Sequence, residues 1–139
     1  MHTKNQIALP GVKASLPALL DFVTQSVKSS QLANDTLDHI RLAVEEAAIN
    51  VIEHGYAGTD PGTICVSIQW GRMQVVVRVT DYGRAFQSVD FNPPKPTAEA
   101  ILKTGENPAF GLRLLREAVD EVHYEATESA NTLTLIKRL

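Results

Sequence analysis

Three polar residues, Glu46, Asn50 and His54, recur at a spacing of four along one stretch of the chain. Positions four apart fall close to one line on an α-helix. Apolar residues flank that line on both sides: Leu42 and Ile49 on one, Ala43 and Ala47 on the other. A carboxylate and an amide are costly to bury without partners, so the line indicates a ligand, a metal or an internal network. Hydrogen bonds to loop backbone above the helix explain the pattern equally well.

A second carboxylate ends a stretch of alternating residues. Met73, Val75, Val77 and Val79 are expected on the inward face of a strand, and strict alternation places Asp81 next on that face. Gly83 follows, and glycine lets the backbone turn sharply or approach a ligand closely. An ordinary Asp-x-Gly turn is the alternative interpretation of this pair.

A third feature is the segment from Gly105 to Gly111, which leads into a helix expected at residues 108–121. The free N–H groups and the positive dipole end of a helix N-terminus favour phosphate. A glycine segment alone is a weak signal. Together, however, the Glu/Asn pair, the inward Asp and this helix start could bind one ligand that has a metal ion, an organic base and phosphates.

Hydrophobic spacing predicts the elements that must position these residues. Two helices are expected early in the chain, one after a capping Ser15 and a longer one from Asn34 or Asp35 to Gly55. A hairpin is expected to join residues 64–70 to 73–79 through a type II′ turn with Gly71 first. The other expected elements are a strand at 6–9, a loop at 87–107, and strands at 122–127 and 132–138.

The strands join mainly by hairpins although helices lie between some of them. We therefore expect a two-layer α/β sandwich, with a mixed, largely antiparallel sheet and the helices on one face. A length of 139 residues suits a single domain spanning 1–139. The single cysteine, Cys65, falls in an alternating strand pattern, where a small half-buried thiol is expected.

Composition excludes some classes of function. The net charge is −3 and the basic residues are scattered, which argues against direct binding to nucleic acid. The first ten residues contain no leader pattern, and no stretch approaches the roughly 20 apolar residues that a membrane helix needs. We therefore expect a cytoplasmic protein without membrane contact.

Three stretches also resemble a known family. Residues 44–56, VEEAAINVIEHGY, resemble the first nucleotide box of the GHKL ATPases, and specifically of the anti-sigma-factor serine kinases. Residues 79–86, VTDYGRAF, resemble the family's Asp-x-Gly-x-x-Phe box, and residues 110–122, FGLRLLREAVDEV, its second glycine box and following helix. The resemblance covers nearly the whole chain, and it implies the Bergerat-type ATP-binding fold.

The resemblance implies a role for each matching residue. Glu46 would be the catalytic base, and Asn50 would ligate Mg²⁺ through its side-chain oxygen. Asp81 would accept a hydrogen bond from the adenine amino group of ATP, and Gly83 would make room for the base. The remaining nucleotide-binding positions would be Gly105, Gly111, Leu112 and Thr132, the last of these near adenine and Asp81.

The chain departs from the family pattern at two places. Asn107-Pro108-Ala109-Phe110 precedes Gly111 where the family has a closely spaced glycine pair. Ala130-Asn131 precedes Thr132 where the family generally has glycine. Asn tolerates left-handed backbone better than most residues, so we expect the second turn to survive.

The function implied by the resemblance is that of an ATP-dependent protein serine kinase that acts as an anti-sigma factor. Its expected partners are a STAS-domain antagonist, which it phosphorylates, and a sigma factor or other regulator, and it is expected to be a homodimer. One alternative is a nucleotide-binding module that only sequesters its partner, although such a module has no need of Glu46. Another is a histidine kinase transmitter domain, which needs a separate phosphoacceptor helix; with 139 residues and no such helix before the domain, we expect this alternative less than the other.

Overall fold

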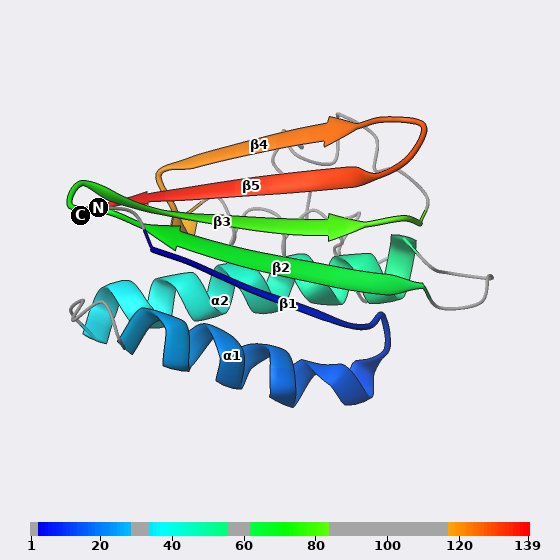
Figure 1. Ribbon diagram of the computed structural model, residues 1–139, viewed down its shortest axis with the longest axis horizontal. Helices are drawn as coiled ribbons and strands as arrows, with labels where there is room; N and C mark the ends of the chain where they lie inside the picture. Colours follow the sequence, from blue (N-terminus) through cyan, green and yellow to red (C-terminus); the bar gives the residue numbers. More distant parts are fainter. Residues whose placement is uncertain (1–2, 29–33, 56–61, 84–116) are drawn as a thin grey trace, which may run out of the picture.

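One five-stranded sheet with two helices on one side makes up the part of the chain that the computed structural model describes, residues 3–28, 34–55, 62–83 and 117–139 (Figure 1). The strands are β1 (Thr3–Pro10), β2 (Thr63–Trp70), β3 (Gln74–Asp81), β4 (Glu121–Ala126) and β5 (Asn131–Arg138). Their order is β1-β2-β3-β5-β4, and every neighbouring pair is antiparallel. This arrangement confirms the expected two-layer α/β sandwich.

The helical layer consists of α1 (Leu16–Lys28) and α2 (Asn34–Asn50). A 3₁₀ turn over Lys13–Ser15 runs directly into α1, so Ser15 lies inside helical structure and not in the extended position that a capping residue takes. A π-helical turn over Val51–Gly55 extends α2. The longer helix therefore ends where expected, but its last turn is wider than an α-helical one.

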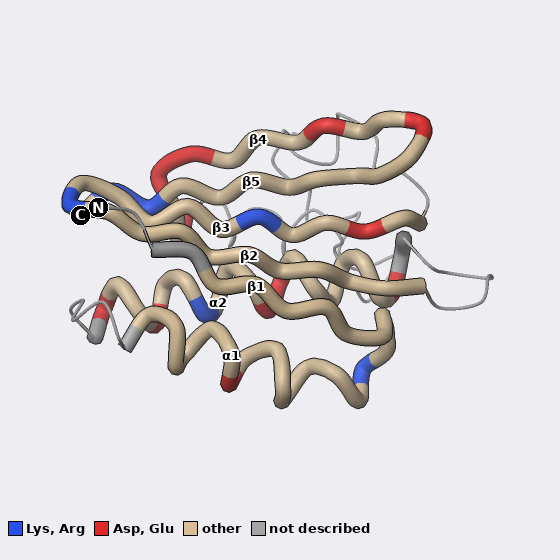
Figure 2. The backbone as a smooth tube through the Cα atoms, in the orientation of Figure 1, with Lys and Arg blue, Asp and Glu red and all other residues tan. Residues whose placement is uncertain are grey.

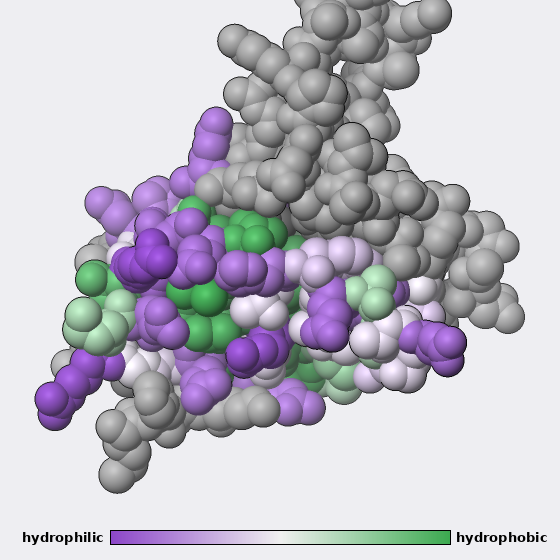
Figure 3. All heavy atoms as spheres, turned by 90° about the horizontal axis from the view of Figure 1, so that it is seen from above, coloured by the Kyte–Doolittle hydropathy of each residue, from purple (hydrophilic) through white to green (hydrophobic). Residues whose placement is uncertain are grey.

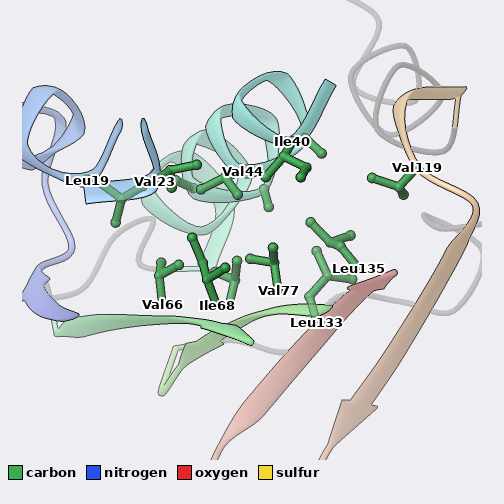
Figure 4. Packing of buried hydrophobic residues seen from close by; sticks show 14 of the residues in the cluster. Leu19, Val23, Ile40, Val44, Val66, Ile68, Val77, Val119, Leu133 and Leu135 are labelled. Carbon is green, nitrogen blue, oxygen red and sulfur yellow. The ribbon is translucent and has the colours of Figure 1, made fainter. Parts of the chain in front are cut away.

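Apolar side chains of both layers meet between the helices and the sheet (Figure 4). One face of α2 and of the turn that follows it is buried: Ile40, Ala43, Val44, Ala47 and Val51 are all at most 3% exposed. The alternate residues of β2 and β3 face them, including Ile64, Val66, Ile68, Val75, Val77 and Val79. Burial of one helix face and one sheet face thus holds the two layers together.

The hairpin between β2 and β3 turns one residue later than the sequence predicts. Trp70 pairs with Val75, and the Gly71 N–H donates to the Gln74 carbonyl at 3.1 Å. The two residues at the tip are therefore Arg72 and Met73, and the prediction of a turn with Gly71 first is wrong. Met73, expected inward, lies outside β3 and is 75% exposed.

The C-terminal part contains the two expected strands, but β4 and β5 each begin one residue earlier than the sequence predicts. Helix is described only at 117–118, and Glu121 already belongs to β4, although the helix was expected to include it. Ala118 and Val119, within the range expected to be helical, are buried. Leu114 and Leu115 lie outside the described residues, as does the expected loop at 87–107.

The surface of the described part is mainly polar. Acidic and basic residues are scattered along the elements and do not gather into one stripe (Figure 2). The face in Figure 3 shows polar side chains with some apolar surface between them. Cys65 is half-buried on β2, as expected. Within residues 3–28, 34–55, 62–83 and 117–139, no helix is long and apolar enough to cross a membrane.

This core makes a direct prediction for stability. Leu135 on β5 is 1% exposed, and Leu135→Ala is expected to lower the free energy of unfolding by about 2–5 kcal/mol through lost burial and a residual cavity. Met73→Ala, at an exposed position, is expected to change it by no more than about 0.5 kcal/mol. Urea denaturation of both variants measures the difference. Equal changes would contradict the placement of Leu135 in the core.

Candidate functional site

The C-terminal end of α2 and the C-terminal end of β3 lie at the same end of the molecule (Figure 1). Asn50 is the last residue of α2 and Asp81 the last of β3. Both are buried, at 9% and 3% exposure, where most of the surrounding buried side chains are apolar. Two of the predicted site residues therefore meet the helix–sheet interface at the same end of the fold.

Asn50 is the first residue that demands an explanation. Its side-chain nitrogen Nδ2 is fully buried and has no hydrogen-bond partner in the described part of the chain. Such a buried, unpaired donor costs about 1–3 kcal/mol, and native structures keep few of them. Within the described residues, therefore, no internal network accounts for this amide nitrogen.

Glu46 lies one α-helical turn before Asn50 and is half-buried. Desolvation by burial raises the pKa of its carboxyl above the ordinary value, and the negative charges of Glu45 and Glu53 raise it further. A carboxylate whose pKa is raised in this way is a better proton acceptor than a fully solvated one. The side chain thus has the electrostatics of a general base.

The surroundings of the Glu46–Asn50 line differ from the prediction in two respects. Ala43 and Ala47 are buried on one side, but Leu42 on the other side is 37% exposed, so the line runs along the edge of the packed face. The π-helical turn begins at Val51, so the α-helical spacing of four does not extend to His54. The side chain of His54 lies outside the described residues.

Asp81 faces the helices, as the alternation of β3 predicts. Its Oδ1 accepts a hydrogen bond from the Gly83 N–H at 2.9 Å, which forms the Asp-x-Gly turn considered as an alternative. The same oxygen accepts a second hydrogen bond from Asn131 Nδ2 at 3.1 Å. The turn is therefore present, and it holds a buried carboxylate at the strand end.

Asn131 is the residue that sequence reasoning missed. It is 3% exposed, pairs with Asp81 across β3 and β5, and also donates to the Gly83 carbonyl at 2.9 Å. Thr132 is the next residue on β5, so its side chain lies on the opposite face of the sheet, where its hydroxyl is 3.4 Å from that of Thr80. The sequence analysis started this strand at residue 132, whereas β5 starts at Asn131. Recognising Asn131 as the first strand residue would have identified its contact with Asp81.

The remaining predicted site residues, Gly105, Gly111 and Leu112, lie outside the described residues. The described ones fit a magnesium–nucleotide site by their donor chemistry. Mg²⁺ takes oxygen ligands, and it is commonly held by one or two protein side chains with waters and substrate phosphates. Asn50 is buried at the end of α2, and its side-chain oxygen is of the type that can supply such a ligand.

Comparisons with known proteins show which family the chain is similar to. The profile of the histidine kinase-like ATPase domain matches residues 9–137. The anti-sigma F factor of Anoxybacillus flavithermus is 29% identical over 107 residues, covering 76% of this chain and 71% of that protein. The serine-protein kinase RsbW of Bacillus pumilus is 28% identical over 110 residues, covering 76% and 67%.

Solved structures show the same fold. The structure of the RsbU and RsbW domains of Rv1364c from Mycobacterium tuberculosis matches with a TM-score of 0.70 at 20% identity, over 99% of this chain. This chain spans only 32% of that solved chain. A histidine kinase domain from the blue-light activated histidine kinase of Erythrobacter litoralis EL346 matches with a TM-score of 0.54 at 17% identity, over 89% of this chain and 61% of that one.

Proposed function

This chain belongs to the histidine kinase-like ATPase domain family, and from that membership we propose that it is an ATP-dependent protein serine kinase that acts as a partner-switching anti-sigma factor. The names of its relatives, anti-sigma F factor and serine-protein kinase RsbW, support this function. The substrate is a serine on a STAS-domain antagonist. The other partner is a sigma factor or a comparable regulator, and the kinase works in the cytoplasm as a homodimer.

The observation that carries the proposal is the pairing of two polar residues one turn apart on α2. Glu46 has a raised pKa at the edge of the core, and Asn50 keeps a buried amide without a full set of partners. A phosphoryl-transfer site uses a group that accepts a proton, which Glu46 would supply, and an oxygen ligand for magnesium, which the side-chain oxygen of Asn50 would supply.

The resemblance to the family suggests a role for each group. Glu46 accepts the proton of the attacking serine hydroxyl, and the new bond forms between that serine oxygen and the γ-phosphorus of ATP as the bond to the β-γ bridging oxygen breaks. Asn50 holds magnesium, which supplies charge neutralisation on the phosphates when it is bound. Asp81 binds the adenine amino group, and Gly83 leaves space beside it. The phosphates are assigned to Gly105, Gly111 and Leu112.

The test is incubation of the chain with γ-labelled ATP, magnesium and the STAS-domain proteins of the same organism. Label on a single serine of one such protein, mapped by peptide sequencing, supports the kinase. Stable binding of a STAS-domain protein or sigma factor without any transfer of label would indicate a sequestering module instead. Sedimentation of the same samples reports the oligomeric state.

The raised pKa of Glu46 predicts the pH dependence of transfer. The base must be ionised to act, so the rate of transfer is expected to fall as the pH is lowered through the pKa of Glu46. Because this pKa is raised, the fall should begin at a higher pH than for an ordinary glutamate. Glu45→Gln removes a neighbouring negative charge, lowers the pKa of Glu46, and should move this acid limb to lower pH. Single-turnover rates between pH 4 and 8 measure the shift.

Asp21→Asn is the matched control for this experiment, since Asp21 is an exposed carboxylate on α1. It should leave the acid limb in place. Glu53→Gln should move the limb in the same direction as Glu45→Gln but less, because Glu53 contributes the smaller of the two charge effects. An acid limb that is identical in all four proteins would contradict Glu46 as the titrating base.

A further inference from the structure

The carboxylate of Asp81 is held from one side only. Both of its hydrogen bonds within the described residues, from the Gly83 N–H at 2.9 Å and from Asn131 Nδ2 at 3.1 Å, reach the same oxygen, Oδ1. A carboxylate offers about four lone-pair sites over its two oxygens. In the described part of the chain no hydrogen bond is made to the second oxygen, Oδ2, so this acceptor remains for another donor.

Asn131 makes two side-chain hydrogen bonds although it is the first residue of β5. It is buried to the same degree as Asp81, and its one amide nitrogen bridges Asp81 Oδ1 and the Gly83 carbonyl, at 3.1 and 2.9 Å. The bridge ties the end of β3, the turn after it and the start of β5 into one unit. A glycine or alanine at this position could form neither contact.

We propose that Asn131 is a positioning residue for nucleotide recognition: it fixes Asp81 with Oδ2 available to the adenine amino group and thereby sets the preference for adenine over guanine. The inference rests on the proposed ATP site. Adenine carries an amino donor at position 6, whereas guanine carries an oxygen acceptor there. A carboxylate locked in one orientation meets the first with a hydrogen bond and the second with repulsion between acceptors.

Locking matters because a free carboxylate can turn or hydrate to suit either base. A recognition group discriminates well only when its supporting contacts hold it close to the productive geometry. Without the Asn131 amide, the Gly83 N–H alone holds Asp81, and one hydrogen bond permits rotation about it. Discrimination should then fall even though Asp81 itself is unchanged.

The experiment measures binding of three magnesium nucleotides by calorimetry: ATP, GTP, and purine riboside triphosphate, which lacks the amino group. In the parent protein ATP is expected to bind more tightly than both of the others. Asn131→Ala should weaken ATP binding roughly tenfold, the effect of about one hydrogen bond, and change the binding of purine riboside triphosphate by less than about threefold. The ratio of ATP to GTP affinity should narrow accordingly.

Thr134→Val serves as the matched control, since Thr134 lies on the same strand but on the outer face, opposite Arg78. It should leave all three affinities unchanged. Asn131→Ser, which keeps a hydrogen-bonding group in the buried position, gives a second measurement should the alanine variant fold poorly, and it should retain part of the selectivity. Thermal unfolding without nucleotide monitors folding of each variant.

Two results overturn the proposal while leaving the proposed function intact. One is an equal loss of affinity for ATP and purine riboside triphosphate, which indicates a general structural role. The other is unchanged or tighter ATP binding in Asn131→Ala, which indicates that the amide occupies the place of the adenine amino group. A parent protein that binds none of the three nucleotides overturns the proposed function and this proposal with it.

Discussion

Glu46→Gln is expected to reduce phosphate transfer to the antagonist by roughly a hundred- to ten-thousand-fold, the usual contribution of a general base. Glutamine keeps the size of the side chain but cannot accept the serine proton. Binding of Mg·ATP should remain close to that of the parent protein, because the carboxylate acts on the hydroxyl and not on the nucleotide. Transfer is measured with labelled ATP and nucleotide binding by calorimetry.

The raised pKa of Glu46 supplies a control for folding. A carboxyl whose pKa is higher in the folded state stabilises the fold below its unfolded pKa, and that stability is lost as the pH rises through the folded value. At neutral pH the ionised Glu46 therefore disfavours folding, and Glu46→Gln should not lower the thermal midpoint. Glu128→Gln, at an exposed position in the turn after β4, should leave transfer unchanged. Equal transfer rates in Glu46→Gln and the parent would remove the catalytic assignment.

Asn50→Ala is expected to weaken both nucleotide binding and transfer. Removing a residue that only hydrogen-bonds to a metal ligand commonly lowers metal affinity by about 10- to 100-fold. Removing a direct ligand should therefore lower the affinity for magnesium by roughly tenfold or more. The effect should appear only with magnesium present. Calorimetric titration with ATP, with and without a chelator, measures this dependence.

Folding should tolerate the substitution of Asn50. Its Nδ2 is a buried donor without a partner in the described residues, and removing such a group relieves a cost to the fold. Gln25→Ala changes an exposed amide on α1 and should affect neither binding nor transfer. If Asn50→Ala lowers affinity equally with magnesium and with chelator, Asn50 is not a metal ligand.

Local periodicity predicted much of the site. A strand alternates its side chains strictly, so the inward position of Asp81 followed from Val75, Val77 and Val79 once the strand was recognised. The buried face of α2 followed in the same way from helical spacing. Both are properties of a single element, which neighbouring residues in the sequence are sufficient to specify.

The limits of periodicity appear where an element begins or ends. Met73 follows the alternation of β3 but lies in the turn, because the hairpin closes at Arg72 and Met73. His54 follows the spacing of α2, but a π-helical turn begins three residues earlier. In each case the pattern continues past the point at which the backbone changes geometry, and side-chain type alone does not mark that point.

The sequence by itself was sufficient to predict which residues would carry the proposed chemistry, Glu46, Asn50 and Asp81, because each is a polar group at a position that local spacing assigns to the packed side. Only the tertiary structure decided what Asp81 contacts. Asn131 lies 50 residues further along the chain, and a shift of one residue in the pairing of β5 would turn Thr132 toward Asp81 in its place. Register between distant strands depends on how all the layers pack together, and no local pattern encodes it.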